Sequence, residues 1–203
     1  PHISDKVAVI HNGIIENFKK LRNRLEKEGY QFSSETDTEV IPWLITSYLK
    51  QGKSPKEAVK TALKELEGAF ALCIIFAGED DLLIAARKGS PLAIGYGDGE
   101  MFVASDAYAL APLTSTLCYL NEGDWAEITR DSATIYDNNN NIVEREIVQA
   151  DVSADTIGKG NYDHFMLKEI YEQPSVIGET LRSFYNTDSN SVELPKLPFD
   201  LST

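Results

Sequence analysis

The chain has 203 residues, of which 42% are hydrophobic and 25% charged, as is usual for a folded globular protein. Its 32 acidic residues outnumber the 19 basic ones and give a net charge of −13, which argues against a nucleic-acid or anionic membrane partner. No apolar run approaches the ~18 residues of a membrane span, and the N-terminus lacks a signal-peptide pattern. The two cysteines, Cys73 and Cys118, lack metal-ligand spacing. We therefore expect a reduced, cytoplasmic protein without a metal or cofactor.

The first third of the chain predicts one strand and three helices. An apolar strand over residues 7–10 leads through Asn12-Gly13 into a helix over 14–28, whose apolar residues recur at helical spacing. A second amphipathic helix is expected from Thr36 or Asp37 to residue 50. The third helix opens with Ser54-Pro55-Lys56-Glu57, where Ser54 and Glu57 form a capping box.

The middle of the chain predicts strands. The run 70–76 is apolar throughout, so we expect it to be buried on both faces. Further strands are expected around one short helix, which is capped by Ser105-Asp106; they cover residues 82–86, 92–96, 101–104, 117–120, 124–129, 133–137 and 142–147. Helices followed by a run of strands indicate an α+β fold or a layered sandwich.

The last quarter of the chain has a weaker pattern. We expect a loop over residues 158–160, a helix over 165–184 interrupted near Pro174, and a linker from Asp188. The predicted organisation is therefore a domain over 1–150, followed by the end of that domain and a linker over 151–203.

Two short motifs carry the candidate chemistry. His11-Asn12-Gly13 places an amide side chain beside a glycine N–H, and Ser34-Glu35-Thr36-Asp37 places a carboxylate near a helix start. Amide and N–H donors suit an oxyanion, and a carboxylate suits an ammonium group. Each motif also has a structural interpretation: Asn12-Gly13 as a strand-to-helix turn, and Asp37 as a helix N-cap, with Thr36 as an alternative cap.

These motifs, together with Gly89-Ser90-Pro91-Leu92, Ala104-Ser105-Asp106 and the segment from Lys168 to Pro174, resemble a known family. They are similar to the glutaminase (type-2 glutamine amidotransferase) domain of the glutamine–fructose-6-phosphate aminotransferases. The Asn-Gly pair is common to all type-2 amidotransferases. The stretch around Asp37 and the segment Lys-Glu-Ile-Tyr-Glu-Gln-Pro are more specific.

The resemblance implies a four-layer αββα sandwich of the N-terminal nucleophile hydrolase type, incomplete at its N-terminus. It implies that Asn12 and Gly13 form an oxyanion hole and that Asp37 holds the α-ammonium group of glutamine. The family's N-terminal cysteine nucleophile and its substrate-gripping arginine stretch do not occur here. We therefore expect an absent N-terminal segment and an absent isomerase domain as partners within one longer protein.

The implied reaction is glutamine hydrolysis that supplies ammonia for making glucosamine-6-phosphate from fructose-6-phosphate. This piece alone is expected to be inactive. Two alternatives remain: a non-catalytic amidotransferase-like binding module, and another type-2 glutamine amidotransferase. Because a missing strand would expose sheet edges and apolar faces, we also expect homo-oligomers.

Overall fold

The structure is a computed structural model that describes residues 1–150, 159–186 and 191–192. The chain divides into two compact units, Pro1–Ala154 and Asp155–Thr203. The division into a domain over 1–150 and the end of that domain with a linker over 151–203 remains a prediction. No helix among the described residues is long and apolar enough to cross a membrane.

The first unit contains a six-stranded antiparallel sheet in the order β1-β2-β3-β4-β8-β9. Its strands are β1 (His2–Ile3), β2 (Val7–Ile15), β3 (Gly68–Phe76), β4 (Leu83–Lys88), β8 (Trp125–Ile128) and β9 (Ala133–Tyr136). The β2–β3 pair is the longest ladder and runs from Val7 opposite Phe76 to Ile15 opposite Gly68.

A second antiparallel sheet has the order β10-β7-β5-β6. Its strands are β5 (Ala93–Tyr96), β6 (Met101–Ala104), β7 (Thr116–Tyr119) and β10 (Ile147–Gln149). β5 and β6, which were predicted as strands 92–96 and 101–104, form a hairpin around Gly97-Asp98-Gly99.

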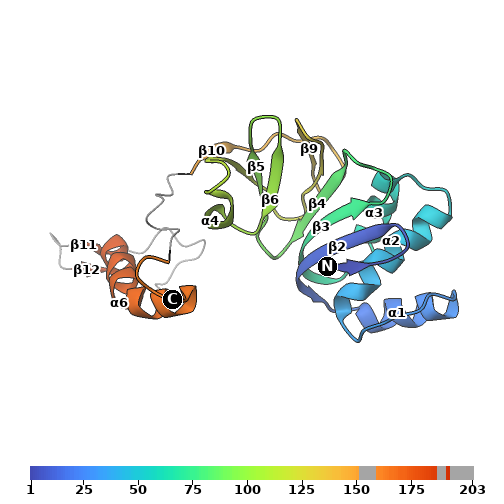
Figure 1. Cartoon of the computed structure of the whole chain (residues 1–203), viewed down its shortest axis with the longest axis horizontal. Helices are drawn as coiled ribbons and strands as arrows, with labels where there is room; N and C mark the ends of the chain where they lie inside the picture. Colours follow the sequence, from blue (N-terminus) through green and yellow to red (C-terminus); the bar gives the residue numbers. More distant parts are fainter. Residues whose placement is uncertain (151–158, 187–190, 193–203) are drawn as a thin grey trace, which may run out of the picture. The chain divides into compact units, whose positions relative to one another are not determined.

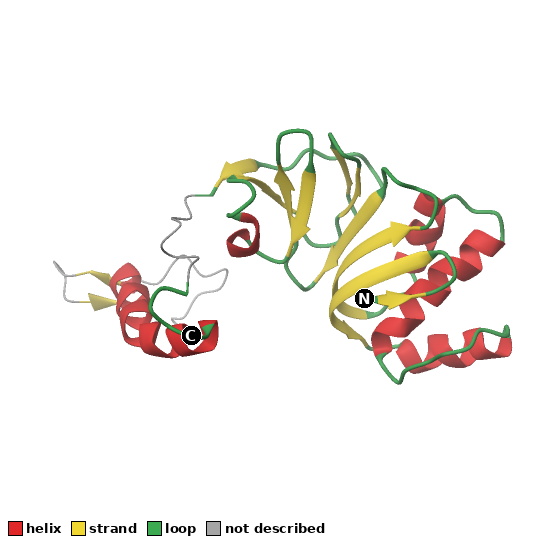
Figure 2. Ribbon diagram, in the orientation of Figure 1, coloured by secondary structure: helices red, strands yellow, loops and turns green. Residues whose placement is uncertain are grey.

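Helices cover the outer face of each sheet. α1 (Phe18–Lys27), the 3-10 turn η1 (Asp37–Glu39), α2 (Val40–Lys50) and α3 (Pro55–Leu63) lie on the six-stranded sheet, and α4 (Ala107–Leu110) lies beside β6 (Figure 1). The largest core joins α1–α3 to one face of the first sheet, and a second core fills the space between the sheets. The layers are therefore helix, sheet, sheet, helix (Figure 2), as the αββα expectation requires.

The second unit contains α6 (Phe165–Phe184) and a small hairpin of β11 (Tyr185–Asn186) and β12 (Ser191–Val192). α6 is continuous through Pro174, so the predicted interruption is wrong. Within the predicted loop 158–160, Gly158 lies outside the described residues. Most of the predicted linker also lies outside them, and its described part, Ser191–Val192, is a strand.

Several strand predictions also need correction. Residues 142–146 of the predicted strand 142–147 do not form one: Ile142 makes an isolated bridge to Tyr136, and β10, which begins at Ile147, pairs with β7 in the other sheet. β3 is buried on the helix-covered face, but Ile75 on its other face is 51% exposed. The prediction that residues 70–76 are buried on both faces is therefore only partly right. The second sheet covers only part of the second face, and the hydrophobicity of the strand does not show how far the other sheet extends over it. The capping box of α3 is present as predicted.

Candidate functional site

Asn12 and Gly13 lie inside strand β2, opposite Ala71 and Phe70 of β3. The strand continues to Ile15, and α1 begins only at Phe18. The interpretation of Asn12-Gly13 as a strand-to-helix turn is therefore wrong. The ladder to β3 holds this pair in an extended conformation, which local composition alone did not indicate.

Gly13 is required by the backbone at this point. Its φ of 129° lies in a region that side chains rarely adopt, and a Cβ built there would lie 2.1 Å from the carbonyl oxygen of Ala69. Only glycine allows the two strands to approach this closely. The N–H of Gly13 is consequently not shielded by a side chain of its own.

Asp37 lies against the same strand. Its Oδ2 accepts a 2.7 Å hydrogen bond from the backbone N–H of Ile15, two residues beyond Gly13. η1 begins at Asp37, with Thr36 in the N-cap position, and neither α2 nor η1 has a side-chain cap hydrogen bond. The N-cap interpretation is therefore wrong for Asp37, whereas Thr36 takes the N-cap position without a side-chain cap hydrogen bond. The carboxylate instead joins η1 to β2 across 22 residues of sequence.

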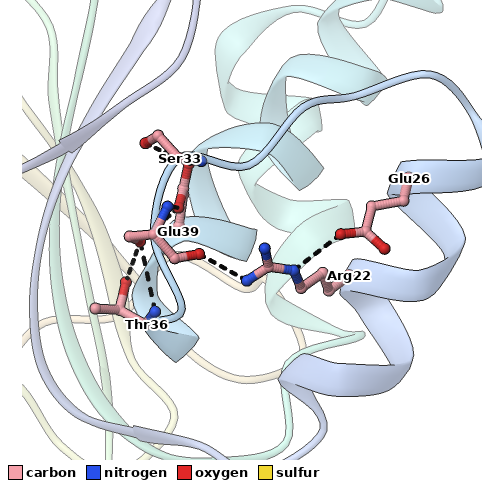
Figure 3. Close-up of polar contacts among 6 residues, drawn as sticks. Arg22, Glu26, Ser33, Thr36 and Glu39 are labelled. Atoms are coloured by element: carbon pink, nitrogen blue, oxygen red, sulfur yellow. Dashed lines mark hydrogen bonds and ion pairs between the residues drawn. The ribbon is translucent and has the colours of Figure 1, made fainter.

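The loop before Asp37 is held by a carboxylate that the sequence analysis did not single out. Glu39 is 3% exposed, and its two oxygens accept hydrogen bonds from the backbone N–H and hydroxyl groups of both Ser33 and Ser34 (Figure 3). Burial favours a raised pKa, but these hydrogen bonds outweigh it and lower the pKa of Glu39 from 4.5 to about 2. The sequence did contain a signal for Glu39, because a charged residue directly precedes the apolar residues that α2 buries.

Helix α1 supports the same loop. Arg22 donates from its guanidinium to the carbonyl oxygen of Ser34 at 2.7 Å and pairs with Glu26 one turn along the helix at 3.0 Å (Figure 3). The Ser34 hydroxyl in turn lies 3.0 Å from the Thr36 hydroxyl. The acidic motif is thus a tied loop that fixes Asp37 beside β2.

His11 forms a hydrogen bond between β2 and η1. Its Nδ1 lies 2.8 Å from the hydroxyl of Thr38, while its Nε2 is buried without a hydrogen-bond partner among the described residues. Burial lowers the pKa of His11; the Asp37 carboxylate opposes this shift and His2 adds to it. We expect His11 to be neutral at pH 7, packing β2 against η1.

Two polar groups remain available for a ligand. Asn12 is exposed, and no hydrogen bond of its side chain occurs among the described residues. In the part of the chain that the structure describes, the Oδ1 atom of Asp37 has only a long contact, 3.4 Å, from the Thr38 hydroxyl. Because a carboxylate oxygen has two lone pairs, Oδ1 can accept further donors. The site therefore offers an amide donor and a fixed carboxylate.

Neither cysteine is an activated nucleophile. Cys73 lies opposite Ile10 on the same face of the sheet as Asn12, and burial raises the pKa of its thiol from 9.0 to about 11. Cys118 is fully buried, and burial raises the pKa of that thiol too. Thiols of this kind remain protonated and unreactive at neutral pH. Among the residues that the structure describes, no cluster of His, Cys, Asp or Glu could hold a metal ion.

The family model of the glutamine amidotransferase domain matches residues 1–112, more than half of the chain. The chain belongs to this family. The motifs around Asn12-Gly13 and Asp37 both lie inside the matched region. The resemblance stated from the sequence is thereby confirmed.

Curated relatives of this amidotransferase domain carry a more specific name. A glutamine–fructose-6-phosphate aminotransferase [isomerizing] from Bradyrhizobium diazoefficiens is 55% identical over 201 residues, covering 98% of this chain and 33% of the relative. One from Zymomonas mobilis is 53% identical over 202 residues, again covering 33% of the relative. The chain therefore spans about a third of the length of the relatives that it matches.

Solved structures agree on the fold of the domain. The glutamine phosphoribosylpyrophosphate amidotransferase from B. subtilis, complexed with ADP and GMP, aligns with a TM-score of 0.56 and 30% identity over 67% of this chain and 30% of that one. An allosteric regulatory enzyme of purine biosynthesis aligns with the same score, 28% identity and 68% coverage of this chain. The predicted αββα fold of the N-terminal nucleophile hydrolase type is confirmed.

Proposed function

We propose that this chain forms part of the glutamine-hydrolysing domain of a glutamine–fructose-6-phosphate aminotransferase. In that enzyme the released ammonia would convert fructose-6-phosphate into glucosamine-6-phosphate in a separate isomerase domain. The observation that carries the proposal is the bond between Asp37 and the Ile15 N–H, because it brings the acidic motif to the strand that contains Asn12-Gly13. We place the protein in the reducing cytoplasm, which suits its two free thiols.

Asn12 and Gly13 would stabilise the oxyanion of the tetrahedral intermediate. Backbone N–H groups alternate between the two edges of a strand. The Ile15 N–H is directed to Asp37 and the Glu16 N–H to Glu67 of the β3 side, so we expect the Gly13 N–H on the Asp37 edge. This N–H and the neighbouring Asn12 amide are two adjacent donors, as an oxyanion hole requires, and one such donor contributes about 3–4 kcal/mol.

Asp37 would bind the α-ammonium group of glutamine through Oδ1. Its other oxygen is fixed by Ile15, so the carboxylate needs little reorganisation when the substrate arrives. The loop tied by Glu39 and Arg22 supports this preorganisation. No bound metal or cofactor takes part in this proposal.

The nucleophile would have to come from a part of the protein outside this chain. Both of its cysteines are protonated and buried or half-buried. We therefore propose that the chain alone releases no ammonia from glutamine. The lack of an activated cysteine in this chain also favours the alternative, a non-catalytic binding module of the same family.

The experiment compares the chain with the longer polypeptide that contains it. Glutamate release should be absent from the chain and present in the longer protein. There, Asn12→Ala should lower kcat by about 10²–10³-fold, whereas Asp37→Asn should mainly raise KM for glutamine. Asn139→Ala, at an exposed residue outside these motifs, serves as the matched control. If the longer protein has no glutaminase activity, the binding module is favoured. If the chain alone releases glutamate, the proposal that its nucleophile lies outside this chain is wrong.

A further inference from the structure

A cavity of about 360 Å³ lies in the first unit, away from the residues discussed so far. It opens between the end of α3, the adjoining ends of β3 and β4, and the turns around Gly123 and Asn138. It shares none of its lining residues with the Asn12, Gly13 and Asp37 site. A volume above about 300 Å³ is sufficient for a small-molecule site.

The floor of the cavity is apolar and partly aromatic. Leu66, Phe70, Ala86 and Trp125 line it, and each is at most 3% exposed. Trp125 is held in place by stacking on Tyr136, with ring centroids 4.3 Å apart. A rigid floor of this kind suits a flat apolar group.

The rim of the cavity is cationic. Lys60, Lys64 and Lys88 line it, and among the described residues none of their ammonium groups forms an ion pair or hydrogen bond with a carboxylate. This is unexpected in a chain with 32 acidic and only 19 basic residues. The Lys88 ammonium group lies 6.0 Å from the centroid of the Phe70 ring.

The carboxylates at the cavity do not neutralise these lysines. Glu122 accepts the N–H of Gly89 at 2.9 and 3.0 Å, and Asp124 forms a two-point ion pair with Arg145 at 2.7 and 2.9 Å. Arg87 adds a further positive charge, held in place by its bonds to the carbonyl oxygens of Ser90 and Leu120. The rim therefore keeps an excess of positive charge above an apolar floor.

We propose that this cavity binds a small organic phosphate with a flat aromatic group, such as a nucleoside monophosphate. The aromatic group would pack on Phe70 and Trp125, and the phosphate would meet the ammonium groups of Lys60, Lys64 and Lys88. Compact ammonium groups are well suited to phosphate oxygens. The site stands independently of the glutamine chemistry proposed above, because it uses different residues.

Trp125 provides a direct readout. In a Trp43→Phe background it is the only tryptophan, since the chain has two. That background removes a buried indole N–H that has no partner among the described residues, so it breaks no hydrogen bond. The probes are AMP, adenosine and inorganic phosphate, which separate the body of the ligand from its charge. AMP should change the Trp125 emission with saturation, and each of the other two should bind at least about 10-fold more weakly.

A charge-matched pair of variants tests the rim. Lys60→Glu/Lys64→Glu should weaken AMP binding by about 10-fold or more, because attraction is replaced by repulsion. Lys6→Glu/Lys27→Glu makes the same change in net charge away from the cavity and should leave affinity within about 2-fold. Circular dichroism establishes that each variant is folded.

Three results would overturn the proposal. One is the absence of any saturable emission change and any calorimetric heat with AMP. The second is equal affinity of the two double variants, or of AMP and adenosine. The third is AMP binding by the chain that disappears in the longer polypeptide, because the cavity would then be a contact surface between parts of that protein.

Discussion

The backbone N–H of Ile15 and the carboxylate of Asp37 are 2.7 Å apart, although 22 residues separate them in the sequence. This bond turns two separate motifs into one site, because Ile15 ends the strand that contains Asn12 and Gly13. Asp37 is therefore fixed by the sheet and not by the helix that follows it.

Glu39 should make the stability of the domain depend on pH. Its pKa is about 2 in the folded state against an ordinary value of 4.5, so its stabilisation is complete above pH 4.5 and is lost as the pH falls towards 2. The loss should be on the order of 3 kcal/mol for this buried group. Urea unfolding between pH 6 and pH 2.5 measures it.

Glu39→Gln provides the matched test of that assignment. The amide nitrogen would face the donors of Ser33 or Ser34, so the variant should lose about 2–3 kcal/mol at pH 7. Its stability should also fall less steeply below pH 4.5. If the free energy of unfolding of the variant falls just as steeply below pH 4.5, other carboxylates cause the pH dependence.

Gly13→Ala should disrupt the β2–β3 ladder. The new Cβ would lie 2.1 Å from the Ala69 carbonyl oxygen at a φ of 129°, so we expect a loss of at least about 3 kcal/mol. Gly29→Ala is the control: φ is also positive there, at 93°, but nothing lies within 4 Å of the added atom. That variant should lose only about 1–2 kcal/mol, as measured by thermal unfolding. Equal losses of stability in the two variants would show that the close approach of β2 and β3 at Gly13 does not determine the effect.

Cys73 should resist thiol reagents in the folded chain. With a pKa of about 11 instead of 9.0, its thiolate is about 100-fold less abundant at pH 8 than that of a free cysteine. Reaction of a Cys118→Ser variant with a disulfide reagent should therefore be slow until denaturant is added. Rapid labelling under native conditions would mean that the strand opens or that the thiol is activated.

The face of the six-stranded sheet that carries Asn12 should drive self-association. Strand pairing places Ile3, Ile10, Ile14 and Ile75 on this face, where they are 66, 58, 64 and 51% exposed. Apolar side chains grouped in this way favour a contact with another surface. Sedimentation velocity should show a species larger than the 22.5 kDa monomer.

Ile10→Thr/Ile75→Thr tests that face while preserving strand propensity. The variant should shift the sedimentation profile towards the monomer. A clean monomer for the unmodified chain would contradict the prediction.

Local patterns identified most elements correctly. Apolar period and capping residues located α2, α3, α4 and the strands from β3 to β9, because these signals act over a few neighbouring residues. They misplaced the start of α1, which depends on how far β2 pairs with β3, and the course of 142–147, which depends on a crossing to the other sheet. Both features depend on pairing with strands that are distant in the sequence, so a local stretch of sequence does not reveal them.

The sequence by itself determined the family and pointed to Asn12, Gly13 and Asp37, since residue types in short motifs are visible without a fold. Only the tertiary structure decided how they act together. It extended β2 through Asn12-Gly13, directed Asp37 to Ile15 instead of to a helix end, and revealed Glu39 as the anchor of the loop between them. The physical reason is that hydrogen bonds of buried groups are satisfied by whatever the fold brings near, at any distance along the chain.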